Sequence, residues 1–498
     1  ASPRSGLSKG GDNIPLLPGP PRPWGEAWGK NNHPHLSRTE PPRQSGGETH
    51  GRTWSGGLRV HSYSTKAVHF SDHHMVTVSL VWEKPITVGK GLWRMNISHL
   101  QDPQVRLSFS RRYLEWVSLK HLFDSPVEWW EMVKERVRGY FRAVGRRKAK
   151  EGRAVFERHN AALQRLSLLQ SRGLDVSSEI AQARQSLTTL YREERKKQTF
   201  RSKLQGLQED EKCTRFFFRR ARTKTNNILS LYNSRGVVVS EEAEAREVAR
   251  EFYEGLYSER PSDGALMDTF LGCLDRRLGD EQMEAELSTE ELTRAVHSLN
   301  THKAPGPDGI PAEFYQAHWD LLKGDVAEVF RAAYREGRLG ASLRQSSVAL
   351  VPKKGDLKDL RNWRPINLLS VDYKIMAKAL MGRFQGLITS VIGPDQTCSV
   401  QGRSINDNLL LARDLIIHSG ERRSPLCLLS LDQEKAFDRV SHVCLERVLE
   451  KMNIPGPLLR WTKICLTDIT GRVVVNRQPS APFDVRSGVR QGCPLASL

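Results

Sequence analysis

The sequence lacks the features that mark secreted, disulfide-bonded or membrane-spanning proteins. Its seven cysteines are odd in number, scattered, and never form a CxxC pair, so we expect neither a disulfide framework nor a zinc site. No apolar run approaches the roughly 20 residues that span a bilayer, and the first residues carry no hydrophobic signal core. We therefore predict an intracellular protein, of the nucleus, the cytoplasm or both, that is not secreted.

The sequence also has fewer acidic than basic residues. The chain carries 76 Lys and Arg against 57 Asp and Glu, a formal net charge of +19 over 498 residues. Basic side chains neutralise phosphates and release the counterions around them, so this surplus favours a nucleic acid as partner. The length predicts about two to four domains and permits a sizeable core.

The N-terminal part changes character near residue 58. Residues 1–58 are rich in Gly, Pro, Ser, Asn and His and poor in aliphatic residues, which predicts disorder. Over 59–100 the pattern becomes strand-like, because Val76, Val78 and Leu80 alternate with polar residues. One or two strands cannot bury a core by themselves.

A long helical region is predicted from about Ser110 to Ser258, within a basic connector over 101–285. Two apolar series at helical spacing flank a break at Ser171-Arg172-Gly173 and predict an antiparallel helical pair. The series are Trp130, Val133, Val137, Tyr140, Phe141 and Val144, then Ile180, Ala183, Leu187, Leu190 and Tyr191. The basic run Arg146, Arg147 and Lys148 fits either a solvated helix face or an electrostatic track for nucleic acid.

The most informative stretch is the apolar run Leu426–Leu431, followed by Asp432 and, five positions later, by Phe437. A run of this kind predicts a strand covered on both faces, which would present the carboxylate of Asp432 at a sheet edge. Rigid presentation of an acid is what metal-dependent phosphoryl transfer requires. By itself, an Asp in this position is more often a helix cap or a surface residue.

Three further blocks give this stretch a context: HKAPGPDGIP at 302–311, NWRPINLL at 362–369 and SGVRQGCPL at 487–495. In this order and at these separations the blocks resemble the reverse transcriptases of LINE-type (non-LTR) retrotransposons, most closely the branch with an apurinic-type endonuclease. The resemblance implies an α+β fold in which the long α-helical connector precedes the fingers and a partial palm of a right-hand polymerase over 286–498. It also implies an antiparallel sheet flanked by helices.

The resemblance assigns roles around the carboxylate. Polymerases hold two magnesium ions about 4 Å apart, and Asp432 matches the family's first ligand, with the backbone carbonyl of Gln433 supporting the second ion. Phe437 matches the aromatic gate that excludes a 2′-hydroxyl and so selects deoxynucleotides, although a core aromatic is the alternative. Asp438 has no such role in the family, so a helix cap or a salt bridge is expected for it.

The segment from Ser346 to Asp356 reads as a strand and a turn, with Trp363 starting the returning strand. This hairpin resembles the fingers element that closes over the triphosphate. The resemblance therefore assigns Arg364 to the β- and γ-phosphates, since a guanidinium fork matches phosphate oxygens. Lys353 is a second candidate, which a solvated turn explains about as well.

Two more blocks match the family near the nascent base pair. The turn that contains Gln491 and Gly492 resembles the block behind the nucleotide and the template base, where a glycine allows close backbone approach. Residues 394–408 resemble the segment that positions the template strand, which makes Arg403 a candidate nucleic-acid contact. After Ser441, a helix with an apolar stripe is predicted up to Pro455.

A further weak resemblance lies upstream. The residues Asp72 and His73, placed before a strand, resemble the closing motif of the exonuclease-endonuclease-phosphatase fold, in which an Asp-oriented His assists attack on a phosphate. Residues 59–100 would then be the C-terminal remnant of such a domain. The preceding 58 residues do not supply its metal ligands, so nicking of DNA is not expected.

These 498 residues contain no aromatic-Ala-Asp-Asp tetrad, which supplies the other two carboxylates in the family. With one ligand in place of three, two ions cannot be held, and we expect a chain truncated at both ends that does not polymerise by itself. An intact relative would copy an RNA template from a DNA target or primer with Mg²⁺ and deoxynucleotides, in a ribonucleoprotein. The alternatives are a non-catalytic nucleic-acid-binding remnant and a helical interaction protein.

Overall fold

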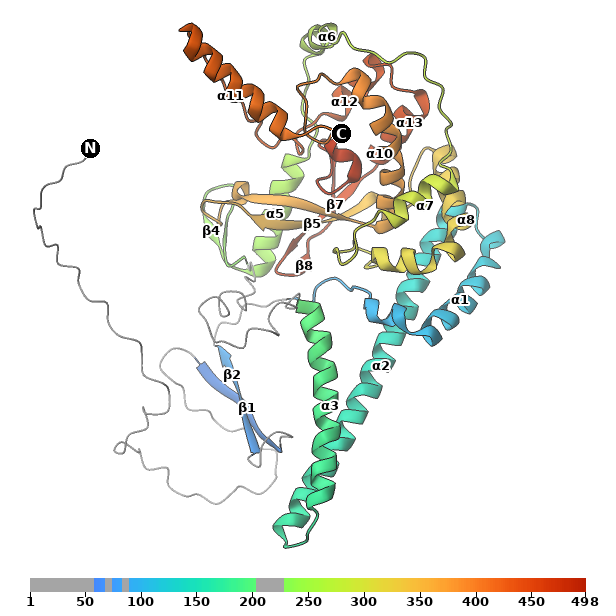
Figure 1. Ribbon diagram of the computed structural model, residues 1–498, viewed down its shortest axis with the longest axis vertical. Coiled ribbons are helices and arrows are strands. Elements are labelled where there is room, and N and C mark those ends of the chain that lie inside the picture. The colour runs from blue at the N-terminus through green and yellow to red at the C-terminus, as the bar shows by residue number, and fades with distance from the viewer. Residues whose placement is uncertain (1–57, 68–73, 83–88, 203–227) are drawn as a thin grey trace, which may run out of the picture.

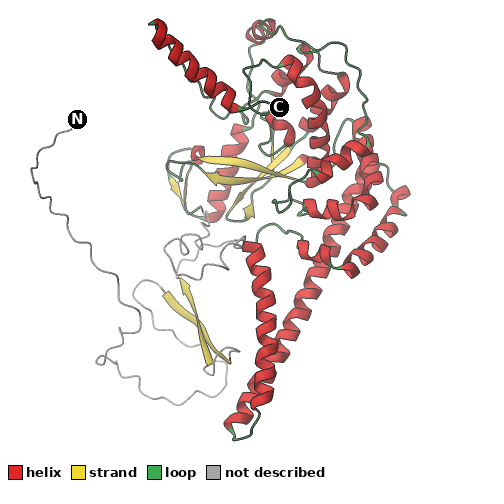
Figure 2. Cartoon of the chain, in the orientation of Figure 1, coloured by secondary structure: helices red, strands yellow, loops and turns green. Residues whose placement is uncertain are grey.

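The computed structural model describes residues 58–67, 74–82, 89–202 and 228–498 (Figure 1). Within them the chain is α+β, as predicted, with helices outnumbering short strands (Figure 2). Across these residues no helix is both long and apolar enough to cross a membrane. The disorder predicted for residues 1–58 falls, apart from Leu58, outside the described residues.

The helices are α1 (Pro103–Val117), α2 (Pro126–Ser171), α3 (Ser177–Ser202), α5 (Glu242–Leu256), α6 (Gly264–Gly272), α7 (Thr289–His297), α8 (Ala312–Glu336), α9 (Ala341–Arg344), α10 (Val371–Val391), α11 (Ile405–Arg422), α12 (His442–Lys451) and α13 (Gly456–Leu466). The strands are β1 (Leu58–Ala67), β2 (His74–Trp82), β3 (Leu231–Tyr232), β4 (Val238–Val239), β5 (Gln345–Pro352), β6 (Trp363–Leu369), β7 (Thr470–Val475), β8 (Gln478–Pro479) and β9 (Phe483–Asp484).

The strands β1 and β2 pair antiparallel, with Leu58 opposite Trp82. Strand structure in this part of the chain was predicted from the alternation of Val76 and Val78, and it is confirmed. The proposed endonuclease residues Asp72 and His73 lie outside the described residues. The strand pair thus leaves the predicted ancestry of residues 59–100 untested.

Helices α2 and α3 form the predicted antiparallel pair, which projects from the body of the molecule (Figure 1). The turn between them contains Gly173 in the left-handed region at φ +89°, as the break in the sequence indicated. Leu163, Ile180 and Leu187 form a small core between the two helices. With 46 residues, α2 is about 70 Å long, and only its first half packs into the body.

The first half of α2 shares a hydrophobic core with α1, α7, α8, α10 and α13. Phe109 lies among the aromatic side chains of this core, with its ring centroid 5.7 Å from that of Phe141 and 5.3 Å from that of Phe314. The core therefore crosses the predicted boundary between residues 101–285 and 286–498. Burial of these aromatic rings is the main stabilising contribution to this junction.

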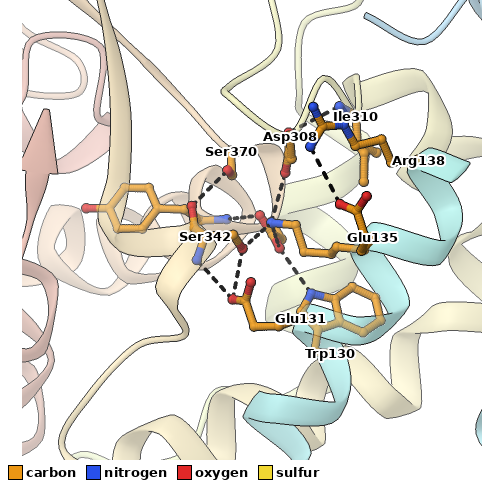
Figure 3. Close-up of polar contacts among 11 residues, drawn as sticks. Trp130, Glu131, Glu135, Arg138, Asp308, Ile310, Ser342 and Ser370 are labelled. Atoms are coloured by element: carbon orange, nitrogen blue, oxygen red, sulfur yellow. Dashed lines mark hydrogen bonds and ion pairs between the residues drawn. The ribbon is translucent and has the colours of Figure 1, made fainter. Parts of the chain in front are cut away.

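A buried ion cluster holds the first half of α2 against α10 (Figure 3). Lys134 Nζ lies 2.8 Å from Asp308 Oδ2 and 2.8 Å from Asp372 Oδ2. It also donates a hydrogen bond of 2.8 Å to Ser342 Oγ, while Trp130 Nε1 donates to Asp372 Oδ2 at 3.0 Å. Burial lowers the pKa of Lys134, but the neighbouring carboxylates more than offset it, so its pKa lies above the usual value.

The central sheet has the strand order β6-β5-β7-β8, and β9 pairs with the edge of β7. The hairpin of β5 and β6 is antiparallel, with Val351 opposite Arg364, as predicted. However, β5 and β7 are parallel, with Val348 opposite Val473, so the prediction of an antiparallel sheet is wrong in this respect. The reason is the long helical connection between these two strands, which a parallel pair requires.

Helix α5 packs on this sheet and completes a second core. Tyr253 and Tyr257 lie at its centre with Trp363, Val473 and Phe483 from the sheet. Both tyrosine side chains at the end of α5 are buried in this core. This packing brings the end of α5 next to the turn that follows β9, because Tyr257 O accepts hydrogen bonds from the two residues after Val485.

The predicted buried strand over Leu426–Leu431 is wrong. These residues have no regular secondary structure and are exposed, with Leu431 at 82%. A strand needs neighbouring strands that bond its backbone and cover its faces, and none of the described strands pairs with this segment. The preceding helix α11 likewise buries no residue and projects from the body (Figure 1).

Candidate active site

The loop from Ser487 to Cys493 lies directly on the segment around Phe437. Gly488 N donates a hydrogen bond of 2.7 Å to Val440 O, and Val489 N donates one of 2.7 Å to Phe437 O. The backbone of Phe437 is therefore fixed by the loop that contains Gln491. Two blocks that the sequence separates by about 50 residues thus form one surface.

The glycines of this loop allow it to approach its neighbours closely. Gly492 has φ +111°, and a Cβ atom at this position would lie 2.7 Å from Asn367 O. On the same side, Asn367 N donates a hydrogen bond of 2.7 Å to Gln491 O. The turn is therefore seated against β6, at a distance that a side chain at position 492 would prevent.

Asp438 lies beneath this surface with its side chain buried. Tyr257 donates its hydroxyl to Asp438 Oδ1 at 2.9 Å, and Gln491 Nε2 lies 3.4 Å from each carboxylate oxygen. The expectation of a helix cap or a salt bridge is wrong, because Ser441 caps α12 and the partners of Asp438 are uncharged. Asp438 instead links α5 to the Gln491 side chain.

Burial raises the pKa of the Asp438 carboxyl, and the Tyr257 hydroxyl with Lys435 and Lys353 offsets part of this effect. Burial likewise lowers the pKa of Lys435, whose Nζ lies 5.5 Å from the centre of the Phe252 ring. Lys435 has no hydrogen-bond partner for this buried Nζ among the described residues. A carboxyl group with a raised pKa and an amine with a lowered pKa therefore lie behind Phe437.

This raised pKa predicts a pH-dependent stability that Asp438→Asn should remove. A carboxyl group whose pKa is raised by folding stabilises the fold fully below its unfolded pKa of about 3.9, and this contribution is lost as the pH rises through the folded pKa. Asp438→Asn should therefore gain stability relative to the unchanged protein between about pH 4 and pH 7. Urea unfolding across that range measures the difference, and a constant difference would contradict the assignment.

The β5–β6 hairpin carries the two candidate phosphate ligands. Arg364 is exposed on β6, and Lys353 follows β5, where its backbone N–H donates to Asn362 O at 2.8 Å. Asn362 also closes the turn by donating from Nδ2 to Asp356 O at 2.9 Å. Asn367 of β6 donates its backbone N–H to Gln491 O at 2.7 Å, so this hairpin contacts the Gln491 loop.

Comparison with known proteins decides the family. Residues 351–498 match the family model described as "Reverse transcriptase (RNA-dependent DNA polymerase)". The chain is 32% identical over 448 residues to the "Transposon TX1 uncharacterized 149 kDa protein" of Xenopus laevis, covering 88% of this chain and 34% of that protein. Residues 351–498 therefore form a reverse transcriptase domain, and the chain is similar to proteins of the transposon TX1 and of R2 retrotransposable elements.

Two further relatives of this reverse transcriptase carry the name of R2 elements. One is the Pol polyprotein from the type-1 retrotransposable element R2 of Popillia japonica, 29% identical over 222 residues, which cover 42% of this chain and 29% of that protein. The other, from the type-2 element R2DM of Drosophila melanogaster, is 23% identical over 218 residues, or 44% of this chain and 20% of that protein. The chain thus spans about a third or less of these relatives.

The reverse transcriptase residues expected to hold metal are exposed. Asp432 and Gln433 lie in the irregular segment before Phe437, and Phe437 itself is 41% exposed, so it is not a core aromatic. Enzymes of this family use divalent metal ions. Within the described residues, however, no group of three or more His, Cys, Asp or Glu side chains could hold such an ion, so the residues present do not fit a two-ion site.

The residues predicted to contact nucleic acid differ in whether their side chains already bind other groups of the protein. Arg403 donates to the backbone carbonyl of Gln396 at 2.8 Å and to further carbonyls after α10, so its guanidinium holds a loop. Lys148 pairs with Asp102. Arg146 and Arg147 are exposed on α2, and Arg147 Nε lies 3.9 Å from Glu151 Oε1.

Several residues of the site were not predicted from the sequence. Tyr257, Asn367 and Lys435 join Asp438 behind the Gln491 loop, although none belongs to a local pattern with a chemical meaning. The one usable signal was proximity in sequence, since Lys435 and Asp438 flank Phe437. The contacts themselves join residues up to 181 positions apart.

Proposed function

We propose that this chain is the nucleotide- and template-binding part of an RNA-directed DNA polymerase, with the fingers and the first part of the palm within residues 286–498. The observation that carries the proposal is the joining of the Phe437 segment to the Gln491 loop through backbone hydrogen bonds of 2.7 Å. In this arrangement two chemical tasks, contact with the sugar and contact with the base, fall to one rigid surface. The basic helical connector over 101–285 packs beside it.

Each side chain then has a defined task. The exposed ring of Phe437 lies beneath the sugar of the incoming nucleotide, where a 2′-hydroxyl would collide with it. Gln491 orients the nascent base pair, held in place by Asp438, and Gly492 lets the backbone approach. Arg364 and Lys353 bind the triphosphate, because the guanidinium and ammonium groups match phosphate oxygens.

Asp432 and the carbonyl of Gln433 are the groups of this chain that would contact Mg²⁺, which in polymerases activates the primer hydroxyl and holds the triphosphate. One carboxylate is too few for two ions, and the aromatic-Ala-Asp-Asp tetrad is absent from these 498 residues. We therefore expect no primer extension by this chain with Mg²⁺ and four deoxynucleotides on an RNA template.

Primer extension tests both parts of the proposal. A product of the same reading frame that includes the tetrad should synthesise DNA, and Asp432→Ala should reduce this synthesis by about a thousandfold or more, as loss of a central electrostatic group does. Synthesis by the 498-residue chain would contradict the one-carboxylate argument. Synthesis that survives Asp432→Ala would contradict the role of that residue.

The incomplete metal site favours a second candidate, a non-catalytic protein that binds RNA through charge. The two candidates differ in deoxynucleotide selection, which only a polymerase needs. For either, the partners are an RNA template and a DNA target or primer, within an intracellular ribonucleoprotein. The endonuclease branch, and the ancestry of residues 59–100, remain part of the proposal and rest on the sequence resemblance alone.

A further inference from the structure

An arginine-lined groove lies between α1 and α2, outside the candidate active site. It encloses about 700 Å³ and is lined by the basic side chains of Arg112, Arg136 and Arg147, with Gly139 and Tyr140 among its other residues. None of its lining residues is acidic. A second hollow of about 330 Å³ shares Arg112 and continues the groove along α1, where Arg111 and the acidic Glu115 are among its lining residues.

The arginines of this groove are short of counter-charges. Among the residues that the structure describes, Arg112 and Arg136 pair with no carboxylate, and Arg147 Nε lies 3.9 Å from Glu151 Oε1, between side chains that are 64% and 65% exposed. Neighbouring basic residues on the same helix differ, since Lys148 is paired with Asp102. Three cations that face one groove repel each other, and an anionic ligand relieves this repulsion.

The floor of the groove is rigid. The hydroxyl of Tyr140 donates to Val105 O at 3.0 Å, which ties α2 to α1. The Arg112 guanidinium lies 5.9 Å from the centre of the Tyr140 ring, a cation–π contact. Because the residues below are buried in the shared core, the groove exists before a ligand arrives, and little ordering accompanies binding.

We propose that this groove binds the phosphodiester backbone of a single RNA strand. Guanidinium forks match phosphate oxygens, and three of them in one groove can bind a backbone without reading its bases. The small volume admits a few nucleotides of one strand, whereas the cross-section of a duplex exceeds it. That the strand is RNA rests on the proposed function; the binding itself needs no DNA synthesis.

Gly139 offers a test that leaves the packing intact. No atom lies within 4 Å of the position that its Cβ would take, and replacing glycine within a helix favours the helix by up to about 1 kcal/mol. Gly139→Glu should therefore fold normally while placing a carboxylate among the three arginines. We expect the dissociation constant for a labelled single-stranded RNA of about 20 nucleotides to rise about tenfold or more at roughly 0.1 M salt.

Gly152→Glu is the matched control. It makes the same change of charge on the same helix, beyond the groove, at a position where a Cβ also meets nothing within 4 Å. Its effect on the RNA affinity should stay within about twofold. Equal losses in the two variants would overturn the proposal, because they would show an effect of overall charge alone.

Two further measurements test the kind of ligand. A plot of the logarithm of the RNA affinity against the logarithm of the salt concentration has a negative slope. This slope should be steeper by about two units in the unchanged protein than in Gly139→Glu, if the variant loses three phosphate contacts. Duplex DNA that competes as well as the single strand would overturn the proposal. The two proposals can fail separately. If no form of the protein synthesises DNA, but Gly139→Glu still binds RNA more weakly than Gly152→Glu, the groove is supported and the polymerase role is rejected.

Discussion

Lys134→Met should lower the free energy of unfolding by about 3–5 kcal/mol, the largest effect expected of any single change considered for this protein. The methionine fills nearly the same volume, so the loss comes from charge and hydrogen bonding. Asp308 and Asp372 would remain buried without the ammonium group that lies 2.8 Å from each of them. Urea unfolding followed by the tryptophan fluorescence of the shared core measures the change.

Two comparisons separate charge from packing in this cluster. Lys150→Met makes the same substitution at an exposed position of α2, and it should change the stability by less than about 0.5 kcal/mol. Adding Asp308→Asn and Asp372→Asn to Lys134→Met should restore much of the lost stability, because no buried charge then lacks a partner. A triple variant that is no more stable than Lys134→Met would show that packing dominates.

Gly488→Ala should destabilise the fold by about 2–5 kcal/mol and displace the segment around Phe437. The residue has φ +82°, which costs an alanine about 1–2 kcal/mol. A Cβ atom would also lie 2.6 Å from Asp438 O, and such overpacking costs about 1–3 kcal/mol more. Thermal or urea unfolding gives the loss, and weaker binding of deoxynucleotides reports the displacement of Phe437.

Gly402→Ala measures how much stability is lost through the positive φ angle alone. Gly402 has φ +83°, nearly the same as Gly488, but nothing lies within 4 Å of its Cβ position. Its substitution should cost only the about 1–2 kcal/mol of the dihedral angle. If the two variants lose equal stability, the close contact between the loop and Asp438 is not tight, and the rigid surface proposed for nucleotide binding is wrong.

The elements that the sequence predicted correctly depend on local signals. The α2–α3 pair follows from helical spacing and a glycine turn, and the start of α7 lies at a capping box of Ser288 and Glu291, which is likewise a short local pattern. The cap at Ser441 and the β5–β6 hairpin were also visible in short segments. Each of these depends on residues within a few positions of each other, so a single sequence is sufficient.

The features that the sequence did not reveal depend on contacts between distant residues. The bond between Trp130 and Asp372 joins positions 242 apart, and the parallel pairing of β5 with β7 requires the helices between them. The wrong prediction for Leu426–Leu431 has the same origin, because an apolar run becomes a buried strand only where other strands receive it. For Asp438, no local pattern distinguishes a cap from a buried link.

The N-terminal half of the continuous helix α2 packs in the shared core, whereas its C-terminal half extends away from the body. From Val144, the last of the buried residues that α2 contributes to the shared core, to Ser171 it runs for about 40 Å. A tilt of about 5° where it leaves the core would swing the far tip by about 3–4 Å, as follows from that length. The arm therefore converts small changes of angle at Val144 into displacements of several ångströms at its tip.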